Sequence, residues 1–482
     1  MEYLIRFSQS HETFRLPELQ ALAVLEGIDI EVISYSLDSP FCIIRLLPPS
    51  SPSSPSSLSD PTTLARKLIR RSILAMSIHE LWGHGPDLAS VHTAVQTSTP
   101  ALWPQYLECS FKFTLDSYQG SRSSDQKIAL INSFSYLGFL GPIKMRSPDQ
   151  EFTLHELWPF NSTPLGIPEP SHLYFTRYLG SSLRDHLPKK LDLKKRRYIS
   201  TTSMDAELAL ITANIALAAP GKLFYDPFCG TGSFPIAVAE FGAVALGSDI
   251  DGRSIRGDEK KRTLKGNFEQ YGLLGRLGGT FTADLTNSPI RKTALGTPGD
   301  GVRGRVFDGI VCDPPYGVRE GLMVLGVRDP EKTPWVERKG REMYKQADFI
   351  PPRKPYGFLA MLDDILQFAA QTLVDNGRVA FWMPTANDEE QEMPVPSHPY
   401  LETLSVSTQV FNKWSRRLIC YRRIPDKDVD PAAVKAREER KLVGKTADEL
   451  NPFRKAYFEG FQTPPATGTS TPAPVTETPP PN

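Results

Sequence analysis

The strongest constraint on the fold is a repeated pattern in the second half of the chain, in which short apolar runs end at an acid or at glycines. The runs cover residues 223–226, 243–248, 279–283 and 307–311. They are followed in order by Gly230-Thr231-Gly232, Asp249, Asp284 and Asp313. Connected parallel strands bring their carboxyl ends to one edge of a sheet, where such sheets bind ligands. The order therefore predicts one doubly wound α/β domain with these segments at a common site.

The glycine turn after the first run favours a nucleoside ligand. Gly230 and Gly232 allow the backbone to approach a ligand at the start of a helix. A dinucleotide-binding fingerprint would have a third glycine where Pro235 stands, which argues against a pyrophosphate and leaves nucleosides such as S-adenosylmethionine. Asp249 is then placed to bind the ribose hydroxyls, and Asp226, just before the turn, is assigned to the same pocket.

Two further segments have a structural and a functional interpretation. Asp284 can accept a hydrogen bond from an adenine amino group, but a helix cap or a solvated turn explains it equally well. Thr202, three residues before Asp205, fits a capping box that opens an amphipathic helix. That structural role alone can account for Thr202 and Asp205.

The segment Asp313-Pro314-Pro315-Tyr316 has the chemistry of a site for an exocyclic amino group. The Asp313 carboxylate and the Pro314 carbonyl can accept hydrogen bonds from the two N–H bonds of the amino group. The nitrogen lone pair then points toward an electrophile. Tyr316 offers a face for an unstacked base, and such a stack returns roughly 1–3 kcal/mol. A simple strand-end turn is the alternative, since Pro-Pro and Tyr-Gly are common in loops.

Together these segments predict a nucleoside-dependent methyltransferase domain from about residue 200 to 425. Two other functions stay open. An adenine-N6 methyltransferase of nucleic acids would use the same amino-group site, and a noncatalytic RNA-binding scaffold would keep the fold but lose a site residue. Cys312 can be interpreted as the nucleophile of a pyrimidine-C5 methyltransferase, but a buried strand-end thiol is commoner. Direct methyl transfer needs no metal, and none is predicted.

Several motifs resemble the tRNA (guanine(10)-N2)-methyltransferase family, in particular the catalytic subunits of its eukaryotic, fungal-like members. In the second half they are Arg197-Tyr198, Thr202-Ser203-Met204-Asp205, Tyr225-Asp226-Pro227-Phe228-Cys229-Gly230-Thr231-Gly232-Ser233, Gly247-Ser248-Asp249-Ile250-Asp251-Gly252-Arg253 and Asp313-Pro314-Pro315-Tyr316-Gly317-Val318-Arg319-Glu320. In the first half they are Glu80-Leu81-Trp82-Gly83, Ser110-Phe111-Lys112-Phe113 and Gly141-Pro142-Ile143. The resemblance covers most of residues 1–425. Cys229 is a departure, since the family has a small aliphatic residue there.

The resemblance implies methylation of the N2 amino group of a tRNA guanosine, with S-adenosylmethionine as the donor. It also implies a THUMP RNA-binding domain before a Rossmann-like catalytic domain, and a small zinc-binding activator subunit as partner. In the family, the segment with Thr202 and Asp205 borders the cofactor pocket. The expected mechanism is direct transfer, in which Asp313 and the Pro314 carbonyl bind N2 while Tyr316 stacks on the flipped guanine.

Breaks in the pattern predict four parts. They are a small α/β domain with a Ser/Pro-rich loop (1–60), a THUMP-like RNA-binding domain (61–185), the Rossmann-like domain (186–425) and a polar, largely disordered tail (426–482). Apolar residues at helical spacing between Thr63 and Trp82 predict one helix there.

Charge and cysteine usage bear on partners and compartment. The 55 Lys and Arg balance 55 Asp and Glu, so tRNA has to meet local basic patches. One candidate patch is Lys194, Lys195, Arg196 and Arg197, and a second is Arg66, Lys67, Arg70 and Arg71. The five cysteines show no paired spacing, and neither a signal peptide nor an 18-residue apolar run is visible. We therefore expect a cytoplasmic protein with reduced thiols and no membrane association.

Overall fold

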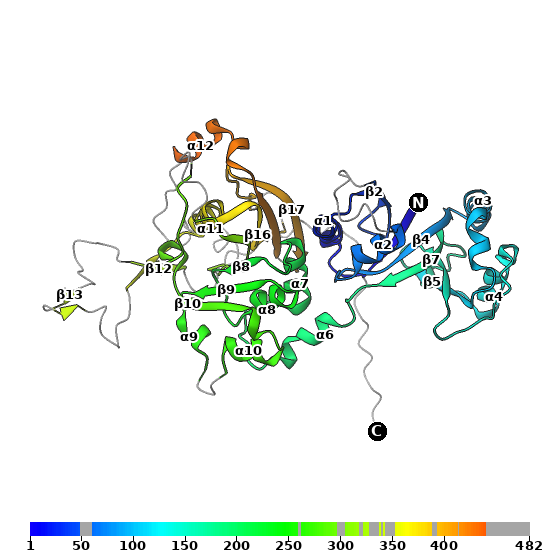
Figure 1. Ribbon diagram of the computed structural model, residues 1–482, viewed down its shortest axis with the longest axis horizontal. Coiled ribbons are helices and arrows are strands. Elements are labelled where there is room, and N and C mark those ends of the chain that lie inside the picture. Colours follow the sequence, from blue (N-terminus) through cyan, green and yellow to red (C-terminus); the bar gives the residue numbers. More distant parts are fainter. Residues whose placement is uncertain are drawn as a thin grey trace, which may run out of the picture.

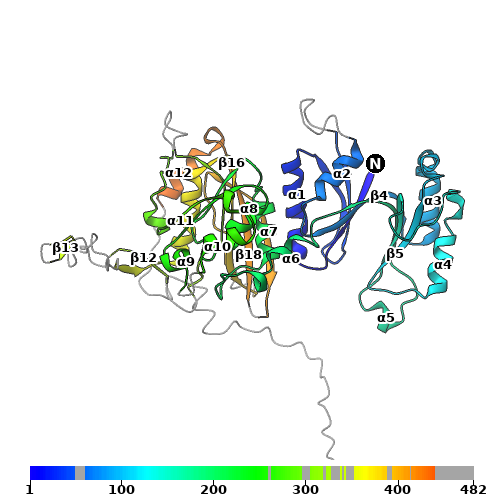
Figure 2. The ribbon, with the colours of Figure 1, turned by 60° about the horizontal axis from the view of Figure 1, so that its bottom comes forward.

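The fold contains two large sheets, one in each half of the chain, connected by the short helix α6 (Leu187–Leu191) (Figure 1). The computed structural model describes residues 1–48, 60–258, 262–295, 304–317, 322–326, 337–338, 341–342, 352–387, 393–412 and 414–439. Two views place helix α1 (Arg15–Glu26) between the first sheet and the second half of the chain (Figures 1 and 2).

The first sheet has seven strands in the order β2-β3-β1-β4-β7-β6-β5. They are β1 (Glu2–Phe7), β2 (Ile30–Tyr35), β3 (Phe41–Leu46), β4 (Ala75–Gly85), β5 (Phe111–Tyr118), β6 (Gln150–Leu157) and β7 (His172–Ser181). Neighbouring strands are antiparallel, except for the parallel pair β5 and β6. The accompanying helices are α2 (Pro61–Ile69), α3 (Leu88–Ser98), α4 (Ser124–Asn132) and α5 (Ser162–Leu165). Because β1 lies between β3 and β4, the sheet continues across the domain boundary predicted at residue 60.

The single helix predicted from Thr63 to Trp82 is wrong. Helix α2 ends at Ile69, and the chain turns at Ser72, whose hydroxyl accepts hydrogen bonds from the N–H groups of Leu74 and Ala75. Strand β4 follows, paired with β1 on one side and β7 on the other. Ile69, Ile73 and Met76 keep a helical spacing of four and three residues across the turn, so periodicity alone does not show where the helix ends.

The second sheet has the order β10-β9-β8-β11-β16-β18-β17. Its strands are β8 (Leu223–Asp226), β9 (Val244–Asp249), β10 (Leu277–Thr282), β11 (Phe307–Cys312), β16 (Leu373–Ala386), β17 (Leu401–Val410) and β18 (Trp414–Arg423). The strands from β10 to β16 are parallel, and β18 and β17 add antiparallel pairs. The predicted doubly wound sheet is thus confirmed. Its topological switch point lies between β8 and β11.

Helices cover both faces of the second sheet. They are α7 (Ala206–Ile215), α8 (Ser233–Glu240), α9 (Gly252–Arg256), α10 (Leu264–Gln270), α11 (Phe358–Thr372) and α12 (Pro431–Glu438). Two small antiparallel pairs also occur, β12 (Met323–Leu325) with β15 (Arg353–Pro355) and β13 (Glu337–Arg338) with β14 (Arg341–Glu342). One buried cluster includes α7 and α8, and another includes α11. Among the described helices, none has the length and apolarity to cross a bilayer.

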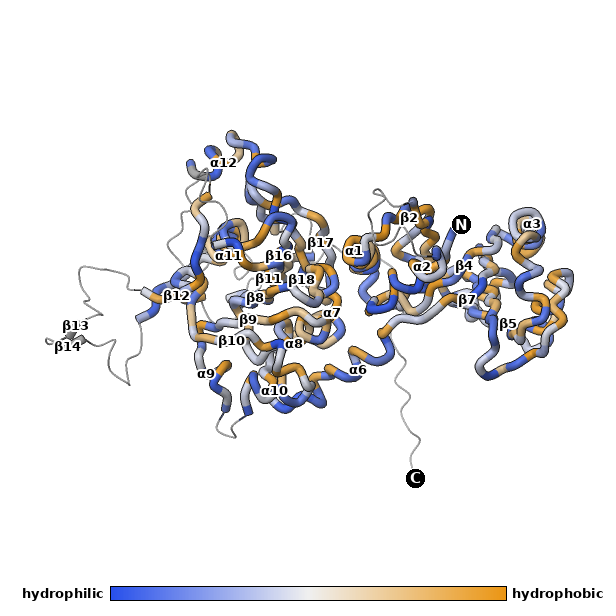
Figure 3. The backbone as a smooth tube through the Cα atoms, in the orientation of Figure 1, coloured by the Kyte–Doolittle hydropathy of each residue, from blue (hydrophilic) through white to orange (hydrophobic). Residues whose placement is uncertain are grey.

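The two halves share one hydrophobic core. The cluster that contains α7 and α8 continues through α1 into the first sheet, and α1 and α7 both carry hydrophobic residues (Figure 3). Phe14 stacks on Trp382 of β16 with ring centroids 5.6 Å apart. Arg71 crosses the same boundary, since it donates to Asn214 Oδ1 at 2.8 Å and to the Ala218 carbonyl at 2.7 Å. Arg71 is buried there, so its assignment to an RNA-binding patch is wrong.

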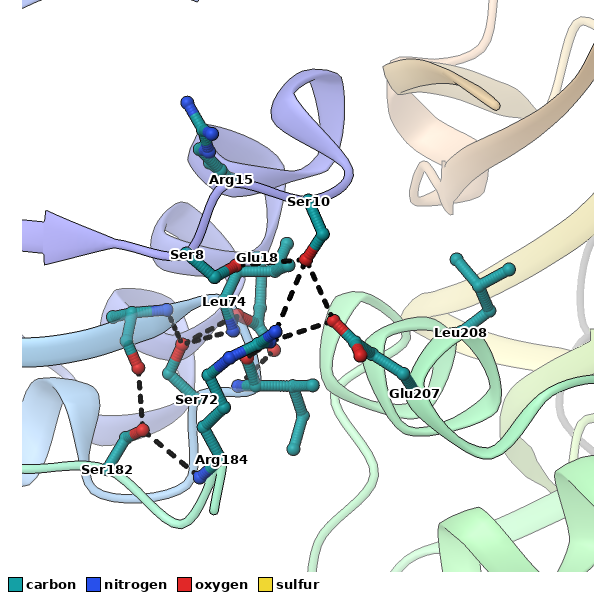
Figure 4. A network of polar contacts seen from close by, with 12 residues as sticks. Ser8, Ser10, Arg15, Glu18, Ser72, Leu74, Ser182, Arg184, Glu207 and Leu208 are labelled. Atoms are coloured by element: carbon teal, nitrogen blue, oxygen red, sulfur yellow. Dashed lines mark hydrogen bonds and ion pairs between the residues drawn. The ribbon is translucent and has the colours of Figure 1, made fainter. Parts of the chain in front are cut away.

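Glu18 on α1 lies at the centre of this boundary (Figure 4). Its buried carboxylate accepts hydrogen bonds from the Ser72 hydroxyl at 2.6 Å and from the N–H groups of Ile73 and Leu74 at 2.9 Å. Asn214 of α7 donates to it at 2.6 Å, across the boundary. Burial raises the pKa of Glu18, and these four donors oppose that shift. One carboxylate therefore connects α1, the turn before β4 and α7.

Residues 426–439 are folded against the second sheet, which corrects the tail predicted from residue 426. Asp426 bonds Arg423 at 2.5 Å. Helix α12 follows, and its Arg437 forms a bidentate pair with Asp363 of α11 at 2.6 and 2.8 Å. The polar composition of this segment gave no indication of these half-buried ion pairs. The rest of the predicted tail lies outside the described residues.

Candidate active site

The site lies at the switch point, where β8 and β11 are neighbours. Gly309 and Ile310 of β11 lie opposite Phe224 and Tyr225 of β8. The carboxyl ends of the two strands therefore lie side by side, with Asp226 on one and the 313–316 segment directly after the other. Asp249 ends β9, the neighbour of β8 on its other side. The strand order thus brings the predicted acids to one edge of the sheet.

The glycine turn between β8 and α8 is held by Asp249. Gly230 and Gly232 have φ angles of 48° and 93°, in the left-handed region that favours glycine. Asp249 Oδ2 accepts a hydrogen bond from Gly230 N at 2.9 Å, and its Oδ1 accepts one from Asp251 N at 2.8 Å. Each oxygen keeps a lone pair, so this carboxylate can still accept hydrogen bonds from ligand hydroxyls.

Three acids around the turn make the site attractive to a cation. Burial raises the pKa of Asp226 well above its ordinary value, and the nearby charges of Asp249 and Asp313 add to this. Burial also raises the pKa of Asp249, and it raises that of Asp313 to about 6. A positive charge close to these carboxylates would stabilise their ionised form. The acids therefore fit S-adenosylmethionine, which carries a sulfonium and an ammonium group.

Asp284 follows β10 and is buried. Its Oδ1 accepts from Thr286 N, and its Oδ2 accepts from Leu325 N of β12, both at 2.8 Å. Asp284 therefore acts as the N-cap of η7 (Leu285–Asn287), as the structural interpretation of this residue predicted, and it also bonds to β12. A bond from Asp284 to an adenine amino group stays a prediction.

The segment before α7 borders the glycine turn, but the predicted capping box is wrong. Asp205 itself is the N-cap, because its Oδ1 accepts from Glu207 N at 2.8 Å, while Thr202 is exposed. The contact with the turn comes from Ser203, whose Oγ lies 2.9 Å from Thr231 Oγ1. Sequence reasoning missed Ser203, because a serine in a loop has no distinctive pattern.

In the 313–316 segment, one oxygen of the Asp313 carboxylate already accepts a hydrogen bond from within the segment. Tyr316 donates its hydroxyl to Asp313 Oδ1 at 2.6 Å, and the Asp313 side chain is 21% exposed. Pro314 is buried, whereas Pro315 is exposed. Burial raises the pKa of the adjacent Cys312 thiol well above its ordinary value, which argues against a cysteine nucleophile. Val318, Arg319 and Glu320 of the longer motif lie outside the described residues.

Sequence reasoning also missed two residues on β18. Arg416 Nη1 lies 3.9 Å from Asp313 Oδ2, and the Trp414 ring lies edge-on to Tyr316 at 6.2 Å. Both residues lie about a hundred positions after the 313–316 segment in the chain. They reach the site because β18 pairs antiparallel with β16. No local spacing could have indicated this contact.

The basic patch before the second sheet is only partly available. Lys194, Lys195 and Arg197 are exposed, but Arg196 is buried and donates to Ser233 Oγ at 2.9 Å. The RNA-binding assignment of Arg196 is therefore wrong, because its side chain connects this segment to the start of α8. The other three stay candidates.

Comparison with known proteins agrees with this geometry. Residues 1–184 match the family model described as "Tmrp11 THUMP N-terminal domain", and residues 194–270 match "RMKL-like, methyltransferase domain". The tRNA (guanine(10)-N(2))-methyltransferase of Saccharomyces cerevisiae is 40% identical over 87% of this chain and 92% of its own. That of Schizosaccharomyces pombe is 36% identical over 95% and 96%, and human TRMT11 is 32% identical over 88% of each chain. This chain belongs to the tRNA (guanine(10)-N(2))-methyltransferase family.

The family models follow the two sheets. The THUMP match covers the whole first sheet, from β1 to β7. The methyltransferase match covers the segment from η5 (Leu193–Lys195) to α10, which includes the glycine turn and Asp249. The resemblance noted in the motifs is confirmed, and so is the predicted fold, a THUMP-type N-terminal half followed by a Rossmann-like methyltransferase domain.

Proposed function

We propose that this family member transfers a methyl group from S-adenosylmethionine to the exocyclic N2 amino group of a tRNA guanosine, at position 10. The single observation that carries the proposal is the place of Asp313. It follows β11 at the switch point, it keeps lone pairs on both oxygens, and the Pro314 carbonyl lies beside it. The relatives in Saccharomyces cerevisiae, Schizosaccharomyces pombe and human, all named tRNA (guanine(10)-N(2))-methyltransferase, suggest the substrate and the position.

The donor occupies the edge of the sheet around the glycine turn in this proposal. Asp249 binds the ribose hydroxyls, and the backbone of the turn at Gly230 and Gly232 approaches the ligand, since these residues have no side chain in the way. Asp226 is close enough to Asp249 and Asp313 for their negative charges to disfavour its ionised form. A bound cation would relieve this repulsion. Thr202, Asp205 and Asp284 border this pocket.

The residues act by positioning the acceptor. Asp313 and the Pro314 carbonyl accept the two N–H bonds of N2, while Pro315 keeps the segment rigid and Tyr316 holds the carboxylate and offers a ring to the base. S-adenosylmethionine supplies an electrophilic methyl group, so a bond forms between N2 and that carbon as the carbon–sulfur bond breaks. N2 then loses a proton, which Asp313 can accept. Positioning supplies most of the rate gain.

The first half of the chain delivers tRNA in this proposal, with a division at about residue 60 and a catalytic domain from 186 to 425. Lys194, Lys195 and Arg197 are exposed beside the connection between the halves, where a phosphate backbone would meet them first. They contribute to tRNA affinity and not to the chemistry.

Nucleoside mass spectrometry tests the function. Unmodified tRNA is incubated with the protein and isotopically labelled S-adenosylmethionine, digested and analysed. We expect labelled N2-methylguanosine, lost when guanosine 10 is replaced by adenosine. Labelled N6-methyladenosine would instead identify an adenine methyltransferase. Absence of any label at saturating donor, both for the protein alone and with candidate activator subunits added, would favour a noncatalytic scaffold.

Replacing Asp249 with alanine should weaken S-adenosylmethionine binding by roughly 1–3 kcal/mol, because the ribose hydroxyls and Gly230 N lose their acceptor. Isothermal titration calorimetry measures the change. Asp251→Ala is the matched control, since Asp251 is half exposed and pairs with Arg253. If Asp251→Ala weakened binding and Asp249→Ala did not, the ribose would be bound by Asp251 instead.

We also propose that the chain needs a small zinc-binding activator subunit. The warrant is the family resemblance, supported by the apolar edge strand β17, on which Leu404, Val406 and Val410 are exposed. In the described ranges, no three metal-type side chains come together. Co-expression with candidate activators should raise the soluble yield and the methylation rate. Full activity of the purified chain alone, as a monomer, would contradict an obligate partner.

A further inference from the structure

Arg416 is placed by the sheet at the edge of the proposed acceptor site. On β18 it lies opposite Pro384 of β16 and Gln409 of β17. Strand β11, which ends at Cys312, pairs with β16 at Phe381, so Pro384 is already beyond the end of β11. The Arg416 side chain therefore projects from the rim of the sheet next to the 313–316 segment.

The guanidinium of Arg416 is fixed in position before any ligand is bound. Its Nε donates to Gln409 Oε1 at 2.6 Å, and its Cζ lies 4.8 Å from the Trp382 ring centroid and 5.7 Å from that of Phe411. The side chain is 17% exposed. Aromatic rings on both of these sides favour the cation and limit its motion. The residue is thus preorganised instead of folding back onto the surface.

The distance from Arg416 to Asp313 leaves both groups with unused hydrogen-bonding capacity. At 3.9 Å, Nη1 and Oδ2 attract one another but are too far apart for a hydrogen bond. Within the described part of the chain, Asp313 is the one acid within ion-pair distance of Arg416. The Tyr316 hydroxyl donates to Asp313 Oδ1 and also interacts with Arg416. A ligand that reaches Asp313 Oδ2 and the other N–H groups of the guanidinium would meet an acceptor and a donor side by side.

The edge of guanine has the complementary pattern. N2–H and N1–H are donors and O6 is an acceptor, so a carboxylate followed by a guanidinium matches all three. Adenine has an acceptor at N1, which would face the Asp313 oxygen, and a donor at N6. Enzymes that act on a flipped base identify it through this edge.

We propose that Arg416 is a specificity-determining residue that donates a hydrogen bond to O6 of the target guanine while Asp313 accepts from N1–H and N2–H. The inference rests on the proposed function, since it assumes that guanine N2 is the methyl acceptor. The rings of Phe411 and Trp414 are stacked at 4.8 Å, and they contact Arg416 and Tyr316 respectively, so they border the same position.

The experiment compares two acceptors that share the N2 amino group. One tRNA carries guanosine at the methylated position, and the other carries 2-aminopurine, which lacks both O6 and N1–H. Arg416→Met should lower kcat/KM for the guanosine tRNA by roughly 10- to 100-fold, the scale of a lost charged hydrogen bond, and change the 2-aminopurine tRNA by less than about threefold. Arg422→Met, on the same strand but paired with Glu402, should change neither.

A pH profile separates specificity from a structural role. The charge of Arg416 and the Tyr316 hydroxyl lower the pKa of Asp313 against its burial, and Asp226 is the other acid whose charge is coupled to it. The wild-type rate should therefore fall as the pH drops through about 6, because the carboxylate is lost. Arg416→Met should move this acidic limb of the pH–rate profile to higher pH, because the pKa of Asp313 rises when the positive charge is removed. Arg416→Lys should keep the limb near the wild-type position but lose the preference for guanosine, because an ammonium lacks the planar fork.

The outcomes separate this inference from the proposed function. Equal losses on both tRNAs, or an unchanged preference in Arg416→Lys, would overturn the role of Arg416 while leaving N2 methylation established by the wild type. If the wild-type protein methylated neither tRNA, with or without candidate activator subunits, the proposed function would fail and this inference with it. Measurements of S-adenosylmethionine affinity and of thermal unfolding show whether each variant is folded. If Arg416→Met is not folded, the base preference of Arg416→Lys tests the role of Arg416.

Discussion

Asp313→Ala should reduce N2 methylation by roughly 10²- to 10⁴-fold while leaving S-adenosylmethionine affinity within a few-fold of wild type. In the proposed arrangement the carboxylate accepts hydrogen bonds from N2–H and N1–H of the guanine and from no part of the methyl donor. Losing two hydrogen bonds to a charged acceptor costs roughly 3–6 kcal/mol, which corresponds to that range of rates. Single-turnover methylation of tRNA measures the loss, and calorimetry measures donor binding.

Two matched variants sharpen the test of Asp313. Asp313→Asn keeps one acceptor oxygen but not the charge, so its loss should be smaller than that of Asp313→Ala. Tyr316→Ala should cost on the order of one base stack, roughly 1–3 kcal/mol, and should also raise the pKa of Asp313, because the Tyr316 hydroxyl lowers it. Methylation by Asp313→Ala at a rate near wild type would remove Asp313 from the acceptor site.

The parallel part of the fold and its acids could be predicted because their signals are local. Each strand from β8 to β11 is a short apolar run that ends at a polar residue, and the topology places those ends together. The glycine turn is equally local, since Gly230 and Gly232 need φ angles that other residues rarely adopt. The motif sequence was therefore sufficient to locate Asp226, Asp249 and Asp313 at one edge.

The rest depended on contacts between distant segments. Arg196, Arg71 and Arg416 each stand beside a second arginine in the sequence. In the fold, however, the first contacts Ser233 after the glycine turn, the second crosses the boundary between the halves and the third faces Asp313. The charge of an arginine does not show which of these contacts it makes, because the partner of each side chain is set by tertiary structure. The same holds for α12, whose ion pair with α11 is invisible in its composition.

Glu18→Ala should destabilise the protein by roughly 2–4 kcal/mol and lower tRNA methylation at 37 °C more than donor binding. The substitution leaves the buried N–H group of Ile73 without an acceptor and that of Leu74 with the Ser72 hydroxyl alone, and a buried donor without an acceptor costs roughly 1–3 kcal/mol. It also removes the acceptor of Asn214, which connects α7 to the first sheet. Since tRNA would be delivered by the first half, loosening this boundary impairs methylation without touching the donor pocket.

Glu18→Gln distinguishes a hydrogen-bond network from simple packing. The glutamine side chain has nearly the same volume as glutamate, but its NH₂ group is a donor that would face the donors now bonded to the carboxylate. We therefore expect Glu18→Gln to be almost as unstable as Glu18→Ala. Gln20→Ala, at an exposed position of the same helix, should change the unfolding temperature by less than about 1 °C, because it buries nothing and leaves the network intact. Thermal unfolding followed by circular dichroism gives the comparison. If Glu18→Gln matched the wild type in stability, the boundary would depend on the shared hydrophobic core of α1 and α7 and not on the carboxylate.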